Sequence, residues 1–297
     1  ISFYGRANYS YDGKYMLQAT IRRDGSSVFG ANNRWGTFPS VSAAWNIAEE
    51  SFLKGSIFDQ LKLRLGYGVS GNALGFGAYS AYTLFGLDSA SSFTYNGITY
   101  SKINATQNGN PDLKWETTKM FNVGVDFAFL NSRLSGSIEF YSKKTSDLIW
   151  GYDVSTNIYP VGTMQANVGD ITNTGIEVTI NAVPVKTKDF TWQTTLNLAH
   201  NKNKVNKLSN TKYSVEYKDW GDPNIAGISS NGEVQRIMEG ESLGTFWTYE
   251  WAGYNEQGQS TFWVHDPETG ERTGEKTTEP TKSDKTKVGC ALPKLTY

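Results

Sequence analysis

The chain alternates apolar and polar side chains over long stretches, beginning near its first residue. In the segment 15–22, the odd positions are apolar and the even positions are mostly polar. A period of two is that of a β-strand, whose successive side chains point to opposite faces. The same alternation recurs in segments 3–9, 41–47, 61–67, 121–127, 134–140, 176–181, 192–198 and 247–251. Within these segments the apolar faces carry no charged residue, so the pattern predicts an all-β protein with two-faced strands.

The connections between these segments alternate in length. Short turns are expected at 11–14, 130–133 and 184–189, and long polar connections at 24–36, 71–116, 150–173 and 202–243. Segment 77–87 also alternates, but counting it as a strand would put a long loop among the short turns. We therefore assign 77–87 to a loop, while 49–60 and 255–290 are too long for the short-turn side. Short turns at one rim and long loops at the other are typical of outer-membrane barrels.

Strand length and aromatic residues indicate what covers the apolar faces. The alternating runs span about ten residues or more, whereas strands of globular proteins have about 5–6. Aromatic residues form 14% of the chain, and several lie near the short turns, as in the interfacial girdle of a membrane barrel. These residues are Tyr9, Tyr11, Tyr15, Trp45, Phe129, Phe190, Trp192 and Tyr254. A soluble sandwich with aromatic ends is the commoner alternative, but the combined features favour an antiparallel transmembrane β-barrel whose apolar face meets lipid.

Composition narrows the functional classes. The net charge of −1 and the pI of about 6.2 give no overall electrostatic footprint for nucleic acid or anionic lipid. The single cysteine, Cys290, excludes an internal disulfide framework. His200 and His265 lack neighbouring ligands at metal-binding spacing, so we expect neither a metal site nor a Ser-His-Asp triad. No catalytic residue and no cofactor is predicted.

Charged residues on the polar sides of the strands are candidates for lining a water-filled lumen. They are Arg6, Arg22, Lys62, Arg64, Asp126, Glu139, Glu177 and Glu250. Glu139 and Glu177 fall on neighbouring strands and could act as an acid–base pair on a glycosidic bond. Because other charges share these faces, we favour the lining role. "DPETGE" (266–271) lacks calcium-loop spacing and is interpreted as a solvated turn.

Aromatic residues in the long connections are candidates for binding ligand. A flat ring stacks on the apolar face of a sugar or on a peptide side chain, while nearby polar groups form hydrogen bonds. The aromatic candidates are Tyr79, Tyr82, Trp150, Tyr159 and Trp220, and Asp219 beside Trp220 is the polar candidate. The alternative is that these residues pack within the loops or contact a partner protein.

Four strings carry a resemblance to a known family: "IRRDGSSVFGANNRWGTFPSVSAAWNIAEESFL" (21–53), "LKLRLGYGVSGN" (61–72), "NPDLKWETT" (110–118) and "NVGDITNTGIEVTINA" (167–182). In this order they resemble the barrel half of SusC/RagA-type TonB-dependent transporters, which are outer-membrane nutrient importers of Bacteroidota. Segment 255–297 departs from the family pattern, although "VGCALPK" (288–294) keeps a strand start.

The resemblance implies a plugged barrel of about 22 strands, of which residues 1–297 supply roughly ten. The plug, the N-terminal strands and the final strands are then expected outside this chain. It further implies active import of oligosaccharides or peptides across the cell outer membrane, with a SusD-like lipoprotein lid and energy from the TonB complex. Two alternatives stay open: a passive outer-membrane barrel or porin, and a soluble β-rich glycan-binding or glycan-cleaving domain.

Overall fold

A computed structural model describes the chain except residues 31, 74–76, 221–232, 267–268, 281–284 and 291–297. The chain divides into two compact units. The first unit comprises residues 1–202 and 209–214, and the second comprises 203–208 and 215–297. Within the described residues, no helix has the length and apolar character needed to cross a membrane.

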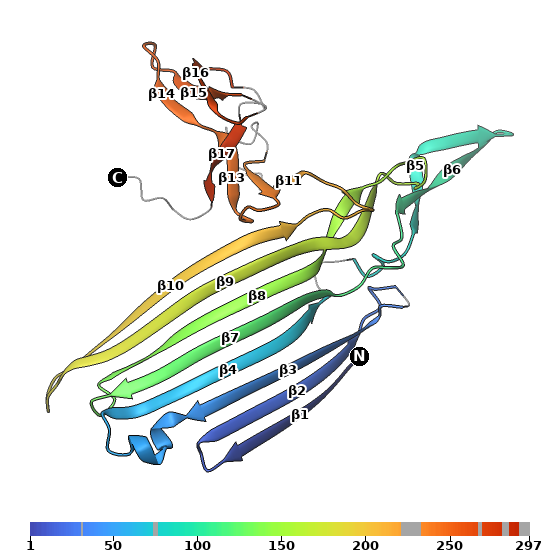
Figure 1. The fold of residues 1–297 in the computed structure, drawn as a ribbon. Coiled ribbons are helices and arrows are strands. Elements are labelled where there is room, and N and C mark those ends of the chain that lie inside the picture. The colour runs from blue at the N-terminus through green and yellow to red at the C-terminus, as the bar shows by residue number, and fades with distance from the viewer. Residues whose placement is uncertain (31, 74–76, 221–232, 267–268, 281–284, 291–297) are drawn as a thin grey trace. The chain divides into compact units, whose positions relative to one another are not determined.

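The first unit is built on a curved antiparallel sheet of eight strands in the order β1-β2-β3-β4-β7-β8-β9-β10 (Figure 1). The strands contain between 10 and 24 residues, which confirms the length expected of a membrane barrel. Their bounds are Ser2–Tyr11 (β1), Tyr15–Gly25 (β2), Trp35–Asn46 (β3), Phe58–Asn72 (β4), Glu116–Phe129 (β7), Leu134–Asp153 (β8), Thr163–Lys186 (β9) and Thr191–Lys207 (β10).

The connections of this sheet differ between its two rims, as predicted. Antiparallel pairing of successive strands puts the β1–β2, β3–β4, β7–β8 and β9–β10 connections at one rim, here named the turn rim. In the first of these turns, Asp12 and Gly13 have φ of 52° and 64°, a left-handed geometry that an Asp-Gly sequence accommodates. The β3–β4 connection contains two short 3-10 helices, Ile47–Glu49 (η1) and Ser51–Leu53 (η2). The opposite loop rim carries connections 26–34, 73–115 and 154–162.

The long connection 73–115 has structure of its own. Leu84–Tyr95 (β5) and Ile98–Gln107 (β6) pair as a separate two-stranded hairpin. Segment 77–87 therefore stays out of the eight-stranded sheet, as expected, but its last residues begin β5 rather than continuing the loop. The alternation thus marked a strand only over residues 84–87. What the pattern could not reveal was that the strand pairs only within its own hairpin.

The second unit contains two small sheets, with strand orders β11-β12-β13-β17 and β14-β15-β16. Their bounds are Tyr217–Trp220 (β11), Gln235–Met238 (β12), Thr245–Tyr249 (β13), Trp251–Tyr254 (β14), Ser260–His265 (β15), Arg272–Thr277 (β16) and Lys285–Cys290 (β17). The expected barrel strand at 247–251 is wrong, because it is split between β13 and β14 in different sheets. The large sheet thus has eight described strands rather than roughly ten, and Tyr254 lies outside its aromatic girdle.

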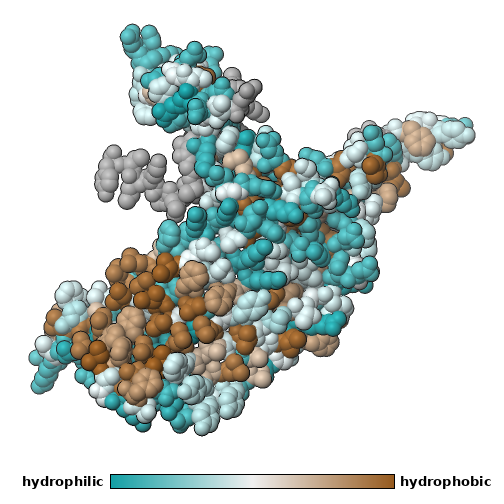
Figure 2. Space-filling view, in the orientation of Figure 1, coloured by the Kyte–Doolittle hydropathy of each residue, from teal (hydrophilic) through white to brown (hydrophobic). Residues whose placement is uncertain are grey.

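The eight-stranded sheet has one apolar and one polar face. Register places Leu17 opposite Ala43, Ala43 opposite Leu65, and Leu65 opposite Val123, so these side chains share a face. Several large apolar side chains of this face, such as Leu17, Leu65 and Phe121, stay 43–48% exposed. They gather over the part of the sheet toward the turn rim (Figure 2). The apolar face is therefore an outer surface rather than a protein core.

Aromatic residues mark both ends of the apolar face. Near the loop rim, the ring of Trp35 stacks on Phe3 at 6.1 Å, and near the turn rim Trp45 stacks on Tyr15 at 6.3 Å. The two tryptophans lie on β3, ten residues apart, a spacing of about 33 Å along the strand. With a tilt of about 40°, this corresponds to about 25 Å across a bilayer, the height of the apolar band of outer-membrane barrels.

A buried phenylalanine on the polar face depends on neighbouring glycines. Phe38 is 8% exposed, and a Cβ built on Gly71 would lie 2.0 Å from its ring. We expect Gly71→Ala to lower the free energy of unfolding by about 1–3 kcal/mol, because the ring must leave its rotamer. Urea titration of the full-length protein in detergent measures this change. Gly5→Ala is the control, since its Cβ would meet nothing within 4 Å; equal effects of the two changes would contradict the packing argument.

Candidate functional site: a polar sheet face and a pinned loop platform

The structure places seven of the predicted lumen-lining residues on the polar face of the eight-stranded sheet. Directly opposite residues of antiparallel strands share a face, and the register links these positions to one another across the sheet. The seven are Arg6, Arg22, Lys62, Arg64, Asp126, Glu139 and Glu177. That this face borders a lumen stays a prediction.

Arg64 is the centre of the polar face. Its Nε and Nη2 donate to the two carboxylate oxygens of Asp126 at 2.9 and 3.0 Å, and Nη2 also reaches Glu139 at 3.3 Å. Gly124 lies directly opposite Arg64, and a Cβ there would be 2.8 Å from Nη2. The glycine therefore leaves room for a two-pronged guanidinium–carboxylate pair, the geometry in which such pairs are strongest.

Glu139 and Glu177 lie directly opposite each other on β8 and β9. Glu139 is engaged, since Arg64 and the amide of Asn122 both donate to it at 3.3 Å. Within the described part of the chain, no ion pair reaches Glu177. The charge of Glu139 is therefore balanced by Arg64, whereas the neighbouring carboxylate of Glu177 has no cationic partner in the described part of the chain. Such a carboxylate attracts a cationic group.

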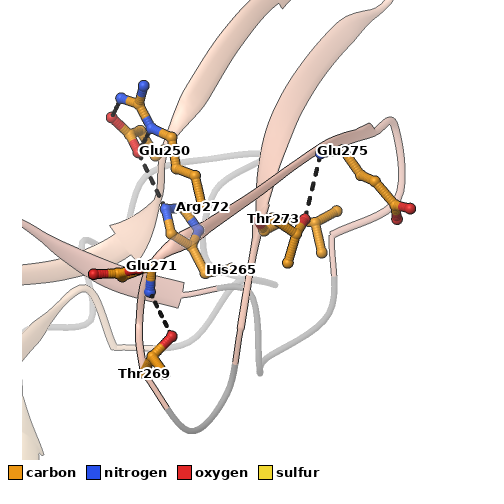
Figure 3. Close-up of polar contacts among 8 residues, drawn as sticks. Glu250, His265, Thr269, Glu271, Arg272, Thr273 and Glu275 are labelled. Atoms are coloured by element: carbon orange, nitrogen blue, oxygen red, sulfur yellow. Dashed lines mark hydrogen bonds and ion pairs between the residues drawn. The ribbon is translucent and has the colours of Figure 1, made fainter.

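Glu250 is the one predicted lining residue that lies elsewhere. It falls between β13 and β14 in the second unit, so it does not belong to the eight-stranded sheet, and its lining role stays a prediction. Its carboxylate accepts Nε of Arg272 at 2.9 Å, and its Oε2 lies 3.2 Å from Nε2 of the buried His265 (Figure 3). The hydrogen bond from Arg272 holds the pKa of Glu250 below its usual value. The carboxylate thereby ties the start of β14 to β15 and β16.

Acid should weaken this contact. Because the pKa of Glu250 is lower in the folded chain than its ordinary 4.5, its contribution to stability is present above pH 4.5 and lost as pH falls through the lower folded value. Glu250→Gln should therefore flatten the acid dependence of unfolding of the second unit, followed by urea titration of the full-length protein at several pH values. Glu256→Gln, at an exposed carboxylate, should keep the wild-type pH profile. An unchanged profile in Glu250→Gln would refute the role of the pair with Arg272.

The connections at the loop rim are packed around a small core of their own. Phe29 and Leu113 are fully buried, together with Ala81 and Ile149 from two other segments. Trp115 packs over this cluster, with its ring centroid 4.9 Å from that of Phe29. The long connections are therefore fixed to the sheet by a shared core, which we name the loop core.

Asparagine side chains fasten the connection 73–115 to the β8–β9 hairpin. Asn108 donates to the carbonyl of Thr163 at 2.7 Å, and Asn110 donates to that of Gln165 at 2.8 Å. Asn167 of β9 makes a contact in the opposite direction: its side-chain oxygen accepts a hydrogen bond from the backbone N–H of Lys114 at 2.9 Å. A side-chain amide both donates and accepts, so it can replace a missing strand partner. Our sequence reasoning missed these residues, although the asparagines of "NGNPD" (108–112) and "NVGD" (167–170) were the available signal.

Tyr79 and Tyr82 lie in the connection 73–115, where the sequence placed them. We name this connection, held by the loop core and the asparagine contacts, the loop platform. The amide of Gln107 donates to both of their carbonyl oxygens at 2.8 Å, which fixes the backbone between them. The hydroxyl of Tyr82 accepts from Arg34 at 2.9 Å, and the ring of Tyr79 is 63% exposed. Two aromatic rings are thus presented by a backbone held by hydrogen bonds, and their role in binding ligand stays a prediction.

Of the remaining candidates, Tyr159 lies in a loop-rim connection as predicted, and the other three lie on strands. Trp150 lies within β8, because the strand continues past a left-handed residue at Asp147 (φ 61°) to its end at Asp153. Tyr159 is half-buried in the β8–β9 connection. Asp219 and Trp220 end β11 in the second unit rather than lying in a loop; the side chain of Trp220 is outside the described part.

Asp219 is engaged within its own sheet. Its carboxylate accepts Nε and Nη2 of Arg236 at 2.7 and 3.2 Å. The same guanidinium lies 3.6 Å from the ring centroid of Tyr217 and 4.4 Å from that of Trp247. The ion pair with Asp219 and the two ring contacts of Arg236 therefore join β11, β12 and β13 of the small sheet.

Comparison with known proteins gives the family. The model of the "TonB dependent receptor-like, beta-barrel" family matches residues 1–270. The chain belongs to this family of outer-membrane barrels. Within the family it is similar to the TonB-dependent receptor SusC of Bacteroides thetaiotaomicron, with 38% identity over 265 residues. A TonB-dependent receptor of Formosa agariphila is 35% identical over 266 residues.

Solved structures give the same fold. The "RagAB peptide transporter" matches with a TM-score of 0.77 and 25% identity, covering 97% of this chain and 30% of that chain. SusC is covered over 26% of its length, against 87% of this chain. The chain therefore spans about a quarter of the length of the curated relatives that it matches. The resemblance to the SusC/RagA type, the all-β barrel architecture and the outer-membrane location are confirmed.

Proposed function

We propose that the chain forms part of the barrel wall of an active outer-membrane importer that carries oligosaccharides or peptides. In this proposal the wall makes and breaks no substrate bond; it encloses a polar passage while its outer surface meets lipid. The two-faced eight-stranded sheet is the observation that supports the proposal. A soluble protein rarely exposes a large apolar face, and here that face lies opposite a polar face centred on Arg64, Asp126 and Glu139, as in the wall of a membrane barrel.

The polar face and the loop platform have different roles in this proposal, and each role follows from the chemistry of the residues there. The polar face offers paired charges and an open carboxylate at Glu177, which suit contact with water, with a plug domain or with a polar substrate. The loop platform displays Tyr79 and Tyr82 for stacking on a sugar or a peptide side chain. The similarity to a peptide transporter supports peptide as a substrate class. The oligosaccharide class and a SusD-like lipoprotein as the lid over the loop rim rest on the resemblance of the sequence to the SusC/RagA type.

Uptake by living cells tests the energised part of the proposal. Cells that carry the full-length transporter as their sole route for a labelled oligosaccharide or peptide are compared with and without a functional TonB complex. We expect uptake to fall to background when TonB is inactive, because the passage opens only when energy is supplied. Uptake that persists without TonB would identify a passive barrel instead.

A second measurement tests the loop aromatics. Tyr79→Ala, compared with the conservative Tyr79→Phe, should weaken ligand binding to the purified full-length complex while the phenylalanine variant retains it, because stacking needs the ring and not the hydroxyl. Isothermal titration with the transported ligand measures both. Wild-type affinity in the alanine variant would leave Tyr79 with a packing role only.

A further inference from the structure

Two lysines face each other on the outer side of the barrel sheet. Lys119 of β7 and Lys144 of β8 are directly opposite in the register, and both side chains are exposed. They share the apolar face, because Phe121 and Phe140 lie on the same side of the same strands at even spacing.

The lysines stand where the apolar face ends. On β7, the outward series toward the loop rim is Val125, Val123, Phe121 and then Lys119. On β8, the outward series is Ile138, Phe140, Ser142, Lys144 and then Ser146. Hydrocarbon-facing residues thus give way to hydroxyl groups and ammonium groups on two neighbouring strands, the order expected where acyl chains meet lipid headgroups.

Protein carboxylates balance the charge of this pair only in part. Lys144 has one carboxylate at the edge of ion-pair distance, Asp170 at 4.0 Å. In the described part of the chain, Lys119 has no acidic partner. Like charges directly opposite on a sheet destabilise it, so a fixed pair of lysines at this position gains from an anion between them.

We propose that Lys119 and Lys144 bind the phosphate of an anionic lipid headgroup at the loop-rim edge of the membrane. A lipid fits better than a free anion because its acyl chains would lie along the apolar series that ends at Phe121 and Phe140, so both parts of the molecule find matching protein surface. The net charge of the chain is near zero, but this does not oppose the proposal, because the site depends on the local charge of two lysines.

Lipid retention by the purified full-length protein tests the site. The protein is exchanged into nanodiscs containing phosphorylated lipid A, or the same lipid with its phosphates removed, and retained lipid is counted by native mass spectrometry. We expect Lys119→Gln/Lys144→Gln to weaken retention of the phosphorylated lipid about 30-fold. That factor corresponds to about 2 kcal/mol at 1.4 kcal/mol per tenfold, or about 1 kcal/mol for each lysine near a charged surface.

Lys143→Gln is the matched control. Lys143 is next to Lys144 in sequence but points to the polar face, where its ammonium lies 5.0 Å from the ring of Tyr141. The control should retain phosphorylated lipid as the wild type does, and the dephosphorylated lipid should bind all forms equally weakly. Equal retention in the double variant, or full competition by inorganic phosphate at millimolar concentration, would overturn the lipid site. Heat-modifiability on gels shows whether each variant is folded, so that a loss of binding is measured on intact barrel.

Discussion

Ile138→Arg should destabilise the folded barrel by about 2–4 kcal/mol, because it places a charge near the middle of the apolar face. Ile138 is 45% exposed and points to the same side as Phe140, between the turn rim and the lysine at position 144. An arginine there would have to leave water for hydrocarbon, or bend its side chain a long way toward the headgroups. Urea-dependent folding of the full-length protein into phospholipid vesicles measures the change in free energy.

The neighbouring position supplies the control. Ser137 lies on the same strand but faces the polar side, opposite Asp126, so Ser137→Arg adds the same charge next to a carboxylate and water. We expect its effect to stay within about 0.5 kcal/mol, as for ordinary surface changes. Equal losses in the two variants, or a larger one for Ser137→Arg, would mean that the apolar face does not meet acyl chains. The membrane assignment of this sheet would then have to be abandoned.

Phe29→Ala should cost about 3–5 kcal/mol of stability, the range for removing a buried aromatic side chain. Phe29 is fully buried in the loop core, packed against Leu113 and the ring of Trp115. The cavity cannot collapse easily, because Gly30 already lies so close to the carbonyl of Pro111 that a Cβ there would be 2.0 Å away. We expect the loop rim to become sensitive to protease while the eight-stranded sheet stays folded.

An exposed phenylalanine in a neighbouring connection isolates the effect of burial. Phe85 on β5 is 68% exposed, so Phe85→Ala should change stability by less than about 0.5 kcal/mol. Limited proteolysis of the full-length protein in detergent, followed by mass spectrometry of the first cut sites, compares the two variants. If Phe29→Ala leaves the connections as resistant as the wild type, the loop core does not hold them in place.

The faces of the strands could be predicted from sequence because each side chain's side follows from its position in a period of two. That rule placed Arg64 and Glu139 on one side and Leu17 and Phe140 on the other without knowledge of any partner strand. The rim asymmetry was equally accessible, since connection length is visible in the chain.

The failures share one cause. At 247–251, the alternation of aromatic and polar residues correctly indicated strand structure but did not show which sheet the residues join, so the place of Glu250 among the small sheets could not be predicted. Trp150 was assigned to a loop because a bulge at Asp147 interrupts the period on β8. The asparagine contacts of Asn110 and Asn167 join residues 55 and 53 positions from their partners, and no local pattern carries such information.

Alone, the sequence determined which side chains share a face, how long the strands are and where the chain turns, since these depend on neighbours one to four residues away. Only the tertiary structure decided which strands pair, where Glu250 and Asp219 find their cations, and that Lys119 meets Lys144. These are pairings between residues far apart in the chain, and their positions are fixed by the register of whole strands rather than by any local preference.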